Sequence, residues 1–412
     1  MELKPGYKLT EAGVIPKDWD ARTIGDCMRL VNGRAFKPAD WKERGLPIIR
    51  IQNLNDADAP FNYFTGSVEE RNRIQFGDLL FAWSGTTGTS FGARIWKGPV
   101  GVLNQHIFKV IPDQTKLTHD FAFLALQKVQ EAIEKQAHGF KASFVHVKKS
   151  DLVGVELPIP PTKSEQRAII AALSDVDTLL AKLDQLISKK RDLKQAVMQQ
   201  LLTGQSRLQG FDGDWAYAKL CQVADISPGI NKPISAMGSG VLYVTVQDLY
   251  KGRSIPVDQL GRIQVSTSEL HSHALAPGDI VFGKSSVKRA GIGYPNIYLG
   301  APEPAVCTGF SYRVRALSKV ADAHFIFYAL RWEPTRKWVI DNSQASALTN
   351  INKRIADSIP IPMPPLSEQI AIATVLTGMG AELAAVEARR EKTQAIKHGM
   401  MQELLTGRTR LV

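Results

Sequence analysis

A long internal repeat constrains this chain more than any other feature of its sequence. Ser164–Leu208 begins with S-E-Q and ends with L-L-T-G-Q-S-R-L, and Ser367–Leu411 begins with S-E-Q and ends with L-L-T-G-R-T-R-L. The two stretches align without a gap at an offset of 203 residues and agree at 18 of 45 positions. Because that offset is about half of the 412 residues, the chain is predicted to contain two copies of one structural plan.

Apolar residues in each copy recur at alternating steps of four and three, which is typical of a coiled-coil seam. The seam positions are Ile169, Leu173, Val176, Leu180, Leu183 and Ile187 in the first copy and Ile372, Leu376, Met379, Leu383 and Val386 in the second. Each copy is therefore predicted to form a helix of about 40 residues, roughly 60 Å long, and the two helices to pair antiparallel as a spacer. Two helices of an ordinary bundle are the alternative.

Helix boundaries are also marked in the sequence. Thr162 with Glu165 has the pattern of a capping box, and Ser164 and Ser367 are candidate N-caps. Gly204 and Gly407 follow the expected last turns.

Four basic residues interrupt the apolar seam. They are Lys190, Lys194, Arg390 and Lys397. We expect a partner helix or a phosphate to be met there, with plain solvated positions as the alternative.

Composition limits the possible function classes. The net charge of +11 is spread over the whole chain without a basic tail, which favours folded faces that track a polyanion such as nucleic acid. The three cysteines are far apart, so neither a disulfide framework nor a zinc site is expected. Cys27 and Cys221 precede similar stretches and are predicted to be small buried residues. Neither a signal peptide nor an apolar run approaching 18 residues is recognised.

Outside the long helices, β-like runs recur in pairs at matching places in the two halves. These pairs are Leu46–Gln52 with Val241–Gln247, Phe76–Phe81 with Pro277–Phe282, and Gly101–Val110 with Ala305–Val314. One helix is expected after each set, over Asp120–Gln136 and over Ala323–Ile340. The predicted class is mixed α/β (α+β), with domains at 1–156 and 209–358 and spacer helices at 157–208 and 359–412.

This order of parts resembles the specificity subunit of type I restriction-modification systems over essentially the whole chain. The residues that carry the resemblance are G-Y-K-L-T with G-V-I-P-K-D-W near the start, the pair G-D-L-L-F and G-D-I-V-F, Asn104-Gln105, and the doubled S-E-Q and L-L-T-G frame. The resemblance implies a non-catalytic DNA reader. Two target-recognition domains, related by a pseudo-two-fold axis, would each read half of a gapped double-stranded site, and the two helices would hold them apart.

The resemblance also implies partners and cofactors. Two modification subunits would carry S-adenosylmethionine and adenine-N6 methylation, and two restriction subunits would carry the ATP- and Mg²⁺-dependent motor and nuclease. This chain itself would hold no cofactor and no metal. The expected location is the cytoplasm of a bacterium or archaeon, with no membrane.

Motifs for chemistry are weak or absent in the sequence. Gly278–Ser285 satisfies the phosphate-loop pattern, but an apolar run separates its glycines, so a strand is predicted instead. His271 and His273 are expected to be surface residues rather than metal ligands. Two alternatives stay open: a fused methyltransferase or nuclease with an unrecognised active site, and a helical scaffold that ignores DNA sequence.

Candidate DNA contacts are polar and basic residues at predicted strand ends and loops, because base edges and phosphates are read by such side chains. In the first domain they are Arg34, Lys37, Arg50, Gln52, Asn53, Ser84, Thr86, Thr87, Asn104, Gln105, His106, Lys141, Ser143, His146 and Lys148. In the second they are Lys232, Thr245, Gln247, Asp248, Lys284, Ser285, Ser286, Lys288, Arg289, Thr308, Ser346, Thr349, Asn350, Asn352 and Lys353.

Overall fold

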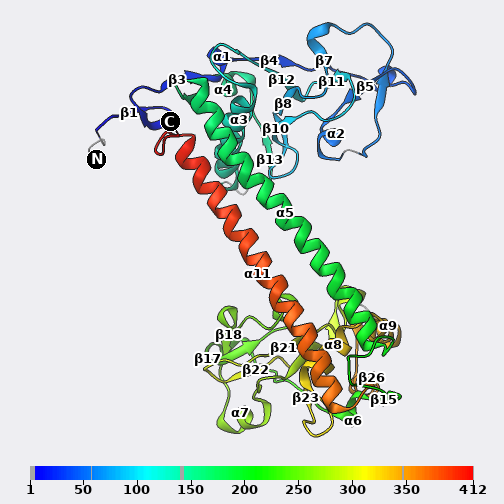
Figure 1. Cartoon of the computed structure of the whole chain (residues 1–412). Coiled ribbons are helices and arrows are strands. Elements are labelled where there is room, and N and C mark those ends of the chain that lie inside the picture. Colours follow the sequence, from blue (N-terminus) through cyan, green and yellow to red (C-terminus); the bar gives the residue numbers. More distant parts are fainter. Residues whose placement is uncertain (1–4, 57, 140–142, 346–347, 412) are drawn as a thin grey trace. The chain divides into compact units, whose positions relative to one another are not determined.

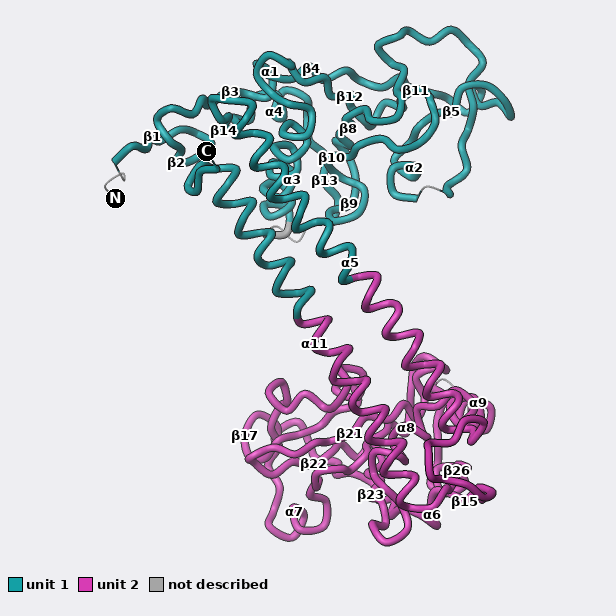
Figure 2. The backbone as a smooth tube through the Cα atoms, in the orientation of Figure 1, with its two compact units in different colours: residues 1–183, 389–412 teal, residues 184–388 magenta. Residues whose placement is uncertain are grey.

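The computed structural model describes residues 5–56, 58–139, 143–345 and 348–411. The chain divides into two compact units (Figure 2). Unit 1 comprises residues 1–183 and 389–412, and unit 2 comprises residues 184–388. The two long helices, α5 (Lys163–Leu202) and α11 (Leu366–Leu404), each give one part to each unit.

In its described residues, unit 1 contains two four-stranded sheets and three two-stranded ones. The first sheet has the antiparallel order β10 (Gly92–Ile95), β8 (Leu79–Ala82), β12 (Ile107–Pro112), β4 (Met28–Asn32). The second has the order β6 (Asn62–Phe64), β5 (Leu46–Ile49), β11 (Gly101–Leu103), β7 (Arg73–Ile74), in which β5 and β11 are parallel. The small sheets are β1 (Tyr7–Thr10) with β2 (Gly13–Pro16), β3 (Asp20–Thr23) with β14 (Glu156–Ile159), and β9 (Ser84–Thr86) with β13 (Phe144–His146). The helices before α5 are α1 (Ile24–Cys27), α2 (Ile51–Asn55), α3 (His119–Gly139) and α4 (Lys149–Val153).

Unit 2 has the same strand order in its first sheet and the same parallel pair in its second, but its second sheet, within the described residues, has three strands. Its first sheet has the antiparallel order β16 (Ala224–Pro228), β23 (Ser311–Ala316), β19 (Ile280–Gly283), β21 (Pro295–Ile297). Its second has the order β18 (Gly261–Ile263), β17 (Met237–Val244), β22 (Ala305–Cys307), again with one parallel pair, β17 with β22. The small sheets are β15 (Ala216–Lys219) with β26 (Pro360–Met363), and β20 (Ser285–Ser286) with β25 (Thr349–Asn350) and β24 (Gln344–Ala345). The helices are α6 (Leu220–Val223), α7 (Thr267–His273), α8 (Ala323–Arg331), α9 (Glu333–Asn342) and α10 (Lys353–Asp357).

The main core of each unit includes opposite ends of the two long helices (Figure 1). In unit 1, Leu173 near the start of α5 shares a core with Leu404 at the end of α11. In unit 2, Leu202 at the end of α5 shares a core with Leu376 near the start of α11. The two helices are therefore antiparallel within each unit, and the expected mixed α/β class with two similar domains is confirmed.

The seam residues lie on the inner faces of these helices. Ile169, Leu173, Leu180, Leu183, Ile187, Ile372, Leu376 and Leu383 are buried, and Val176, Met379 and Val386 are half-buried. At two of the four basic interruptions the helices form ion pairs. Lys190 lies 2.7 Å from Glu382 in unit 2, and Lys397 lies 2.6 Å from Asp177 in unit 1.

The repeated S-E-Q and the arginine after L-L-T-G meet in each unit. In unit 2, the guanidinium of Arg207 donates two hydrogen bonds, of 2.6 and 2.7 Å, to the buried carboxylate of Glu368. In unit 1, Arg410 binds Glu165 in the same way, and hydrogen bonding to this carboxylate raises the pKa of the arginine. Since an unpaired buried carboxylate is costly, each helix end depends on the arginine that the other helix delivers.

The glutamine of the same motif joins each long helix to a domain helix. The buried Gln166 accepts a hydrogen bond from the N–H of Thr118, just before α3, and donates one to the carbonyl of Lys116. Gln369 accepts from the N–H of Asp322 and donates to the carbonyl of Val320, just before α8. The repeat therefore encodes the same two junctions in both units.

Several local expectations were wrong. Ser164 and Ser367 lie inside α5 and α11, and Thr162 is the residue whose hydroxyl accepts the N–H of Glu165 at 3.1 Å. Thr162 thus supplies its half of the expected capping box, and the Glu165 side chain binds Arg410. Cys221 is exposed rather than buried, whereas Cys27 is buried as expected.

The elements after the second half's strands also differ from expectation. The helix expected over Ala323–Ile340 breaks at Trp332 into α8 and α9, because Pro334 has no N–H to continue the ladder. The strands expected over Leu46–Gln52 and Val241–Gln247 end at Ile49 and Val244 and lead into helical turns. Gly278–Ser285 contains the buried strand β19, so its predicted strand conformation is confirmed.

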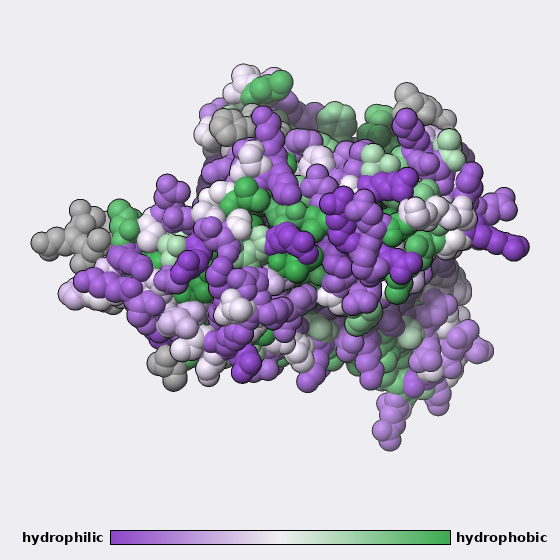
Figure 3. All heavy atoms as spheres, turned by 90° about the horizontal axis from the view of Figure 1, so that it is seen from above, coloured by the Kyte–Doolittle hydropathy of each residue, from purple (hydrophilic) through white to green (hydrophobic). Residues whose placement is uncertain are grey.

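Among the residues that the structure describes, one helix, α11, is long and apolar enough to cross a membrane by its length and composition. An 18-residue window of α11 has a mean hydropathy of 1.5, with 33% of the window buried. In unit 2 this helix gives Ile372 and Leu376 to the core and buries Glu368 at its start. Hydrophilic residues also predominate on the face in Figure 3, with hydrophobic ones in separate patches.

Candidate nucleic-acid interface

Backbone hydrogen bonds bring several strand ends of unit 1 together. The N–H of Asn104, which follows β11, donates to the carbonyl of Ile49 at the end of β5, at 3.0 Å. The N–H of Arg34 donates to the carbonyl of Leu103 at 2.8 Å. Arg34, Arg50 and Asn104 therefore occupy one edge of the second sheet.

A tryptophan joins the other predicted segments of unit 1. Strand β9 pairs with β13 so that Ser84 lies opposite His146. The neighbouring Trp83 has its ring 5.2 Å from that of His106 and 4.8 Å from that of His146, and its indole N–H donates to the carbonyl of Gln105 at 3.1 Å. Together, 83–86, 104–106 and 143–148 form what we call the unit 1 loop cluster. Trp83 was not among the predicted DNA contacts. Its position after a buried strand and before the polar run S-G-T-T-G-T is the sequence feature that could have identified it.

Unit 2 builds the same frame with different side chains. Lys284 occupies the place of Trp83: its N–H donates to the carbonyl of Phe310 at 2.7 Å, and its carbonyl accepts from Ile351 at 2.8 Å. In unit 1, Trp83 makes the equivalent bonds with His106 and Val147. We call 284–289, 308–310 and 349–353 the unit 2 loop cluster.

The lysine at the centre of this cluster is held in place. Its ammonium group donates to the carbonyl of Gly309 at 2.7 Å and lies 4.4 Å from the ring centroid of Tyr312. Burial lowers the pKa of Lys284. A cationic group thus stands where unit 1 has an aromatic one.

The candidate contacts differ in exposure. Exposed residues are Arg34, Lys37, Gln52, Thr86, Gln105, Ser143, His146, Lys148, Gln247, Lys288, Arg289, Asn352 and Lys353. Half-buried ones are Arg50, Thr87, Asn104, His106, Lys232, Thr245, Lys284, Ser285, Ser286 and Asn350. Buried ones are Asn53, Ser84, Asp248, Thr308 and Thr349. Lys141 and Ser346 lie outside the described residues.

Several of these side chains serve the fold. The side chain of Asn53 accepts the N–H of Arg50 and donates to the carbonyl of Ala59. Asp248 is buried, which opposes ionisation, but hydrogen bonds from Lys251 and Thr245 nevertheless hold the pKa of this carboxyl below its usual value. Lys232 is paired with Glu269 at 2.7 Å. Such residues shape the loops and are poor candidates for reading bases.

A basic cavity of about 960 Å³ extends the unit 1 site beyond the predicted residues. Its lining includes Arg29, Arg34, Arg71 and Lys149, with Glu69 as the acidic member. The guanidinium of Arg34 lies 4.6 Å from the ring centroid of Phe64, which holds the side chain at the rim. Arg29 and Arg71 carried no sequence signal beyond their charge.

No arrangement for metal chemistry appears in the part of the chain that the structure describes. Within 5–56, 58–139, 143–345 and 348–411, no group of three or more His, Cys, Asp or Glu side chains could hold a metal ion. His271 is exposed in the last turn of α7, and His273 lies 3.2 Å from the carbonyl of Pro228. The arrangement is suited to binding, with polar and cationic side chains presented on paired strand ends.

Comparison with known families decides which class of protein has this arrangement. The family model of the type I restriction modification DNA specificity domain matches residues 16–189 and 214–396, which is more than half of the chain. The chain belongs to this family. Each matched stretch of the specificity family falls on one copy of the repeated plan.

Relatives in the specificity family align over nearly the full length. The type I restriction enzyme MjaVIII specificity subunit of Methanocaldococcus jannaschii is 25% identical over 419 residues, covering 96% of this chain and 94% of the relative. The EcoBI specificity subunit of Escherichia coli is 22% identical over 419 residues, covering 95% of this chain and 85% of the relative.

Solved structures show the same fold. The S subunit of a type I restriction-modification system from M. genitalium matches with a TM-score of 0.58 at 17% identity, covering 98% of each chain. A chain from a structure on the complex assembly and conformational transition of the type I R-M system matches with a TM-score of 0.60 at 18% identity, covering 95% of this chain and 99% of that one.

Proposed function

We propose that this chain is the DNA-recognition subunit of a type I restriction-modification complex and carries no catalytic site of its own. Each unit would read one half of a gapped double-stranded site through its loop cluster. The observation that carries this proposal is the duplicated frame with different central side chains, Trp83 in one unit and Lys284 in the other. One scaffold with two sets of side chains is what reading two different half-sites requires.

We select the proposed DNA contacts from the candidate residues whose side chains are accessible to solvent. In unit 1 the set comprises Arg34, Gln105 and His146, with the basic cavity that includes Arg29 and Arg71 as a phosphate-binding margin. In unit 2 it comprises the exposed Lys288, Arg289 and Asn352 together with the half-buried Lys284. Base edges would be met by the amide, imidazole and guanidinium groups, and phosphates by the remaining cations.

Assembly with other subunits is part of the proposal. Two modification subunits would bring S-adenosylmethionine and adenine-N6 methylation, and two restriction subunits would bring the ATP- and Mg²⁺-dependent nuclease, in the cytoplasm of a bacterium or archaeon. Residues 1–156 and 209–358 would be the target-recognition domains and 157–208 and 359–412 the spacer segments. Half-sites about one turn of DNA apart, roughly 34–36 Å between centres, suit a stiff helical spacer.

The test of this proposal is base-resolution mapping of methylated adenines in cells that express the chain with its modification subunits. We expect one split motif with a fixed gap, and no methylation when the chain is omitted. The purified chain alone should give no turnover with S-adenosylmethionine. Turnover by the chain alone would instead support a fused methyltransferase, and methylation without a defined motif would support a scaffold that ignores sequence.

A further inference from the structure

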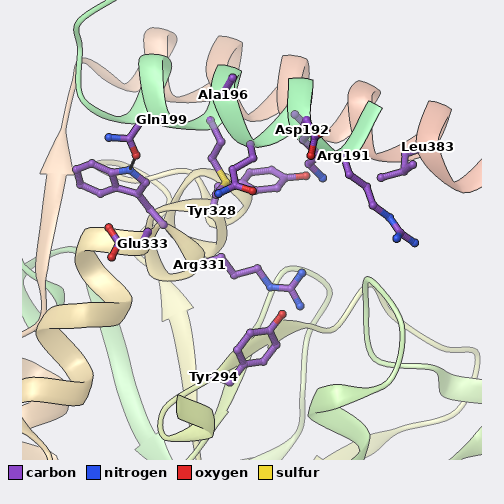
Figure 4. A pocket seen from close by; sticks show the side chains of 13 residues that line it. Arg191, Asp192, Ala196, Gln199, Tyr294, Tyr328, Arg331, Glu333 and Leu383 are labelled. Carbon is purple, nitrogen blue, oxygen red and sulfur yellow. Dashed lines mark hydrogen bonds between the residues drawn. The ribbon is translucent and has the colours of Figure 1, made fainter. Parts of the chain in front are cut away.

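A cavity of about 860 Å³ lies in unit 2, and none of its lining residues belongs to the unit 2 loop cluster (Figure 4). The second half of α5 gives Arg191 and Lys194 to its wall, α8 gives Tyr328 and Arg331, and Tyr294 closes another side. A cavity of a few hundred to about 1,000 Å³ with aromatic walls and a few polar groups has the size and lining of a small-molecule site. Nothing in the proposed DNA-reading role uses it.

Two cations face this cavity without an acidic partner. Within the described residues, neither Lys194 nor Arg331 forms an ion pair with a carboxylate. Lys194 lies 5.3 Å from the ring centroid of Tyr328, and Arg331 lies 5.0 Å from that of Tyr294 and donates its Nε–H to the carbonyl of Pro295. The lining carboxylates, Asp192 and Glu333, are exposed.

The positive charge is concentrated and partly dehydrated. Burial lowers the pKa of Lys194, and the nearby charges of Arg253 and Arg331 lower it further. Burial also lowers the pKa of Arg331. Arg253 shares Glu387 with Arg191, and its buried Nη1 has no hydrogen-bond partner within the described residues. Cations in this state are stabilised by a bound anion.

Comparison of the two repeat copies shows that Lys194 lacks the carboxylate partner that its counterpart has. At the offset of 203 residues, Lys194 corresponds to Lys397, and Asp177, which pairs with Lys397 at 2.6 Å in unit 1, corresponds to Gly380. A Cβ atom at Gly380 would lie 3.1 Å from the Lys194 ammonium. Unit 2 has therefore kept the lysine and replaced its carboxylate by a residue without a side chain, beside an open cavity.

We propose that this cavity binds a small molecule through a phosphate-type oxyanion, which takes the place of the missing carboxylate. Arg331 can offer two N–H groups to phosphoryl oxygens, and Lys194 adds a point charge. Tyr294, Tyr328 and Trp332 provide aromatic surface for an organic part of the ligand. Free phosphate and the phosphate of a mononucleotide share this chemistry. The inference does not depend on how the loop clusters read DNA.

The test is titration of the full chain by calorimetry and thermal unfolding at constant ionic strength. Inorganic phosphate and adenosine monophosphate are compared with chloride, on the wild type and on Gly380→Asp, Gly380→Ala and Lys194→Gln. We expect saturable phosphate-dependent stabilisation of the wild type and of Gly380→Ala, which controls for helix propensity. Gly380→Asp should be more stable in chloride and lose the response, and Lys194→Gln should bind at least about tenfold more weakly.

The outcomes separate the possible ligands. Tighter binding of adenosine monophosphate than of phosphate identifies a nucleotide-type ligand, and equal binding identifies the free anion. The proposal is overturned if the wild type shows no phosphate response, or if Gly380→Asp responds like Gly380→Ala. A Lys194-dependent response to duplex DNA of arbitrary sequence, with none to phosphate or adenosine monophosphate, would also overturn it and would mark a DNA-backbone contact.

Discussion

Glu165 and Glu368 are buried carboxylates, and each is neutralised by an arginine that is distant in the sequence. Arg410, which binds Glu165, lies 245 residues after it, and Arg207, which binds Glu368, lies 161 residues before it. Such a pair adds little net stability over an apolar pair, but breaking it leaves a buried charge without a partner. The repeated S-E-Q and L-L-T-G-x-x-R sequences therefore specify which helix ends pack together in a unit. A tryptophan packs at each junction. The guanidinium of Arg410 lies 5.7 Å from the ring centroid of Trp19, and that of Arg207 lies 5.5 Å from the ring centroid of Trp215.

The cysteines give a prediction at the scale of single residues. Burial raises the pKa of Cys27 to about 11 and that of Cys307 to about 12, so both stay protonated thiols near neutral pH. Because the thiolate is the reactive form, a thiol reagent should label the exposed Cys221 alone in the native chain and all three cysteines after denaturation. Mass spectrometry of the labelled chain measures this. Cys221→Ser should abolish native labelling, and fast labelling of Cys307 would contradict the buried position.

At the scale of elements, α5 carries a second apolar row beside the seam. Leu179, Leu186 and Leu193 are spaced by seven residues and are 37%, 40% and 53% exposed. An exposed heptad row next to a coiled-coil seam is a surface on which a further helix can pack. We propose that the unit 2 part of this row, Leu186 and Leu193, contacts the proposed modification subunits.

This assignment predicts the behaviour of a double variant in unit 2. Leu186→Ser with Leu193→Ser should weaken binding of the modification subunit by about tenfold or more, since each leucine buries apolar area in the complex. The free energy of unfolding should change by less than about 1 kcal/mol, because both side chains are already exposed. Sedimentation of the mixed subunits and urea denaturation measure the two effects. Gln185→Ser is the matched exposed control, and unaltered assembly of the leucine variant would exclude this row as the dock.

For the whole molecule, the duplicated plan predicts that the two halves of the DNA site can be changed independently. Gln105→Ala with His146→Ala should alter or relax only the half-site read by unit 1, and Lys288→Ala with Arg289→Ala only the other half. Loss of a base-edge contact costs about 1–3 kcal/mol, which is enough to change the methylated motif. Methylation mapping in cells measures both. Lys319→Ala, an exposed lysine outside the unit 2 loop cluster, is the control, and a change in both halves from one pair would contradict independent reading.

Much of the fold followed from the sequence because its signals are local and repeated. Apolar residues at alternating steps of four and three predicted the two long helices and their inner faces. The gapless alignment at an offset of 203 residues revealed the duplication. Gly204 and Gly407 marked the helix ends because they adopt φ values of +69° and +68°, where a side chain is strained. The helix break at Trp332 was not predicted, although Pro334 is a helix-breaking residue in the sequence.

The remaining features depend on contacts between residues that are far apart in the chain, so only the tertiary structure decided them. The sequence by itself determined the duplication, the helices, the mixed α/β class and the chain segments in which polar loop residues lie. Only the structure revealed that Asn53 and Asp248 are enclosed, that Trp83 and Lys284 occupy equivalent places, and that Lys194 lacks the carboxylate given to Lys397. Burial and pairing depend on which strand ends and helix faces meet, and a one-dimensional pattern of residues does not contain those distances.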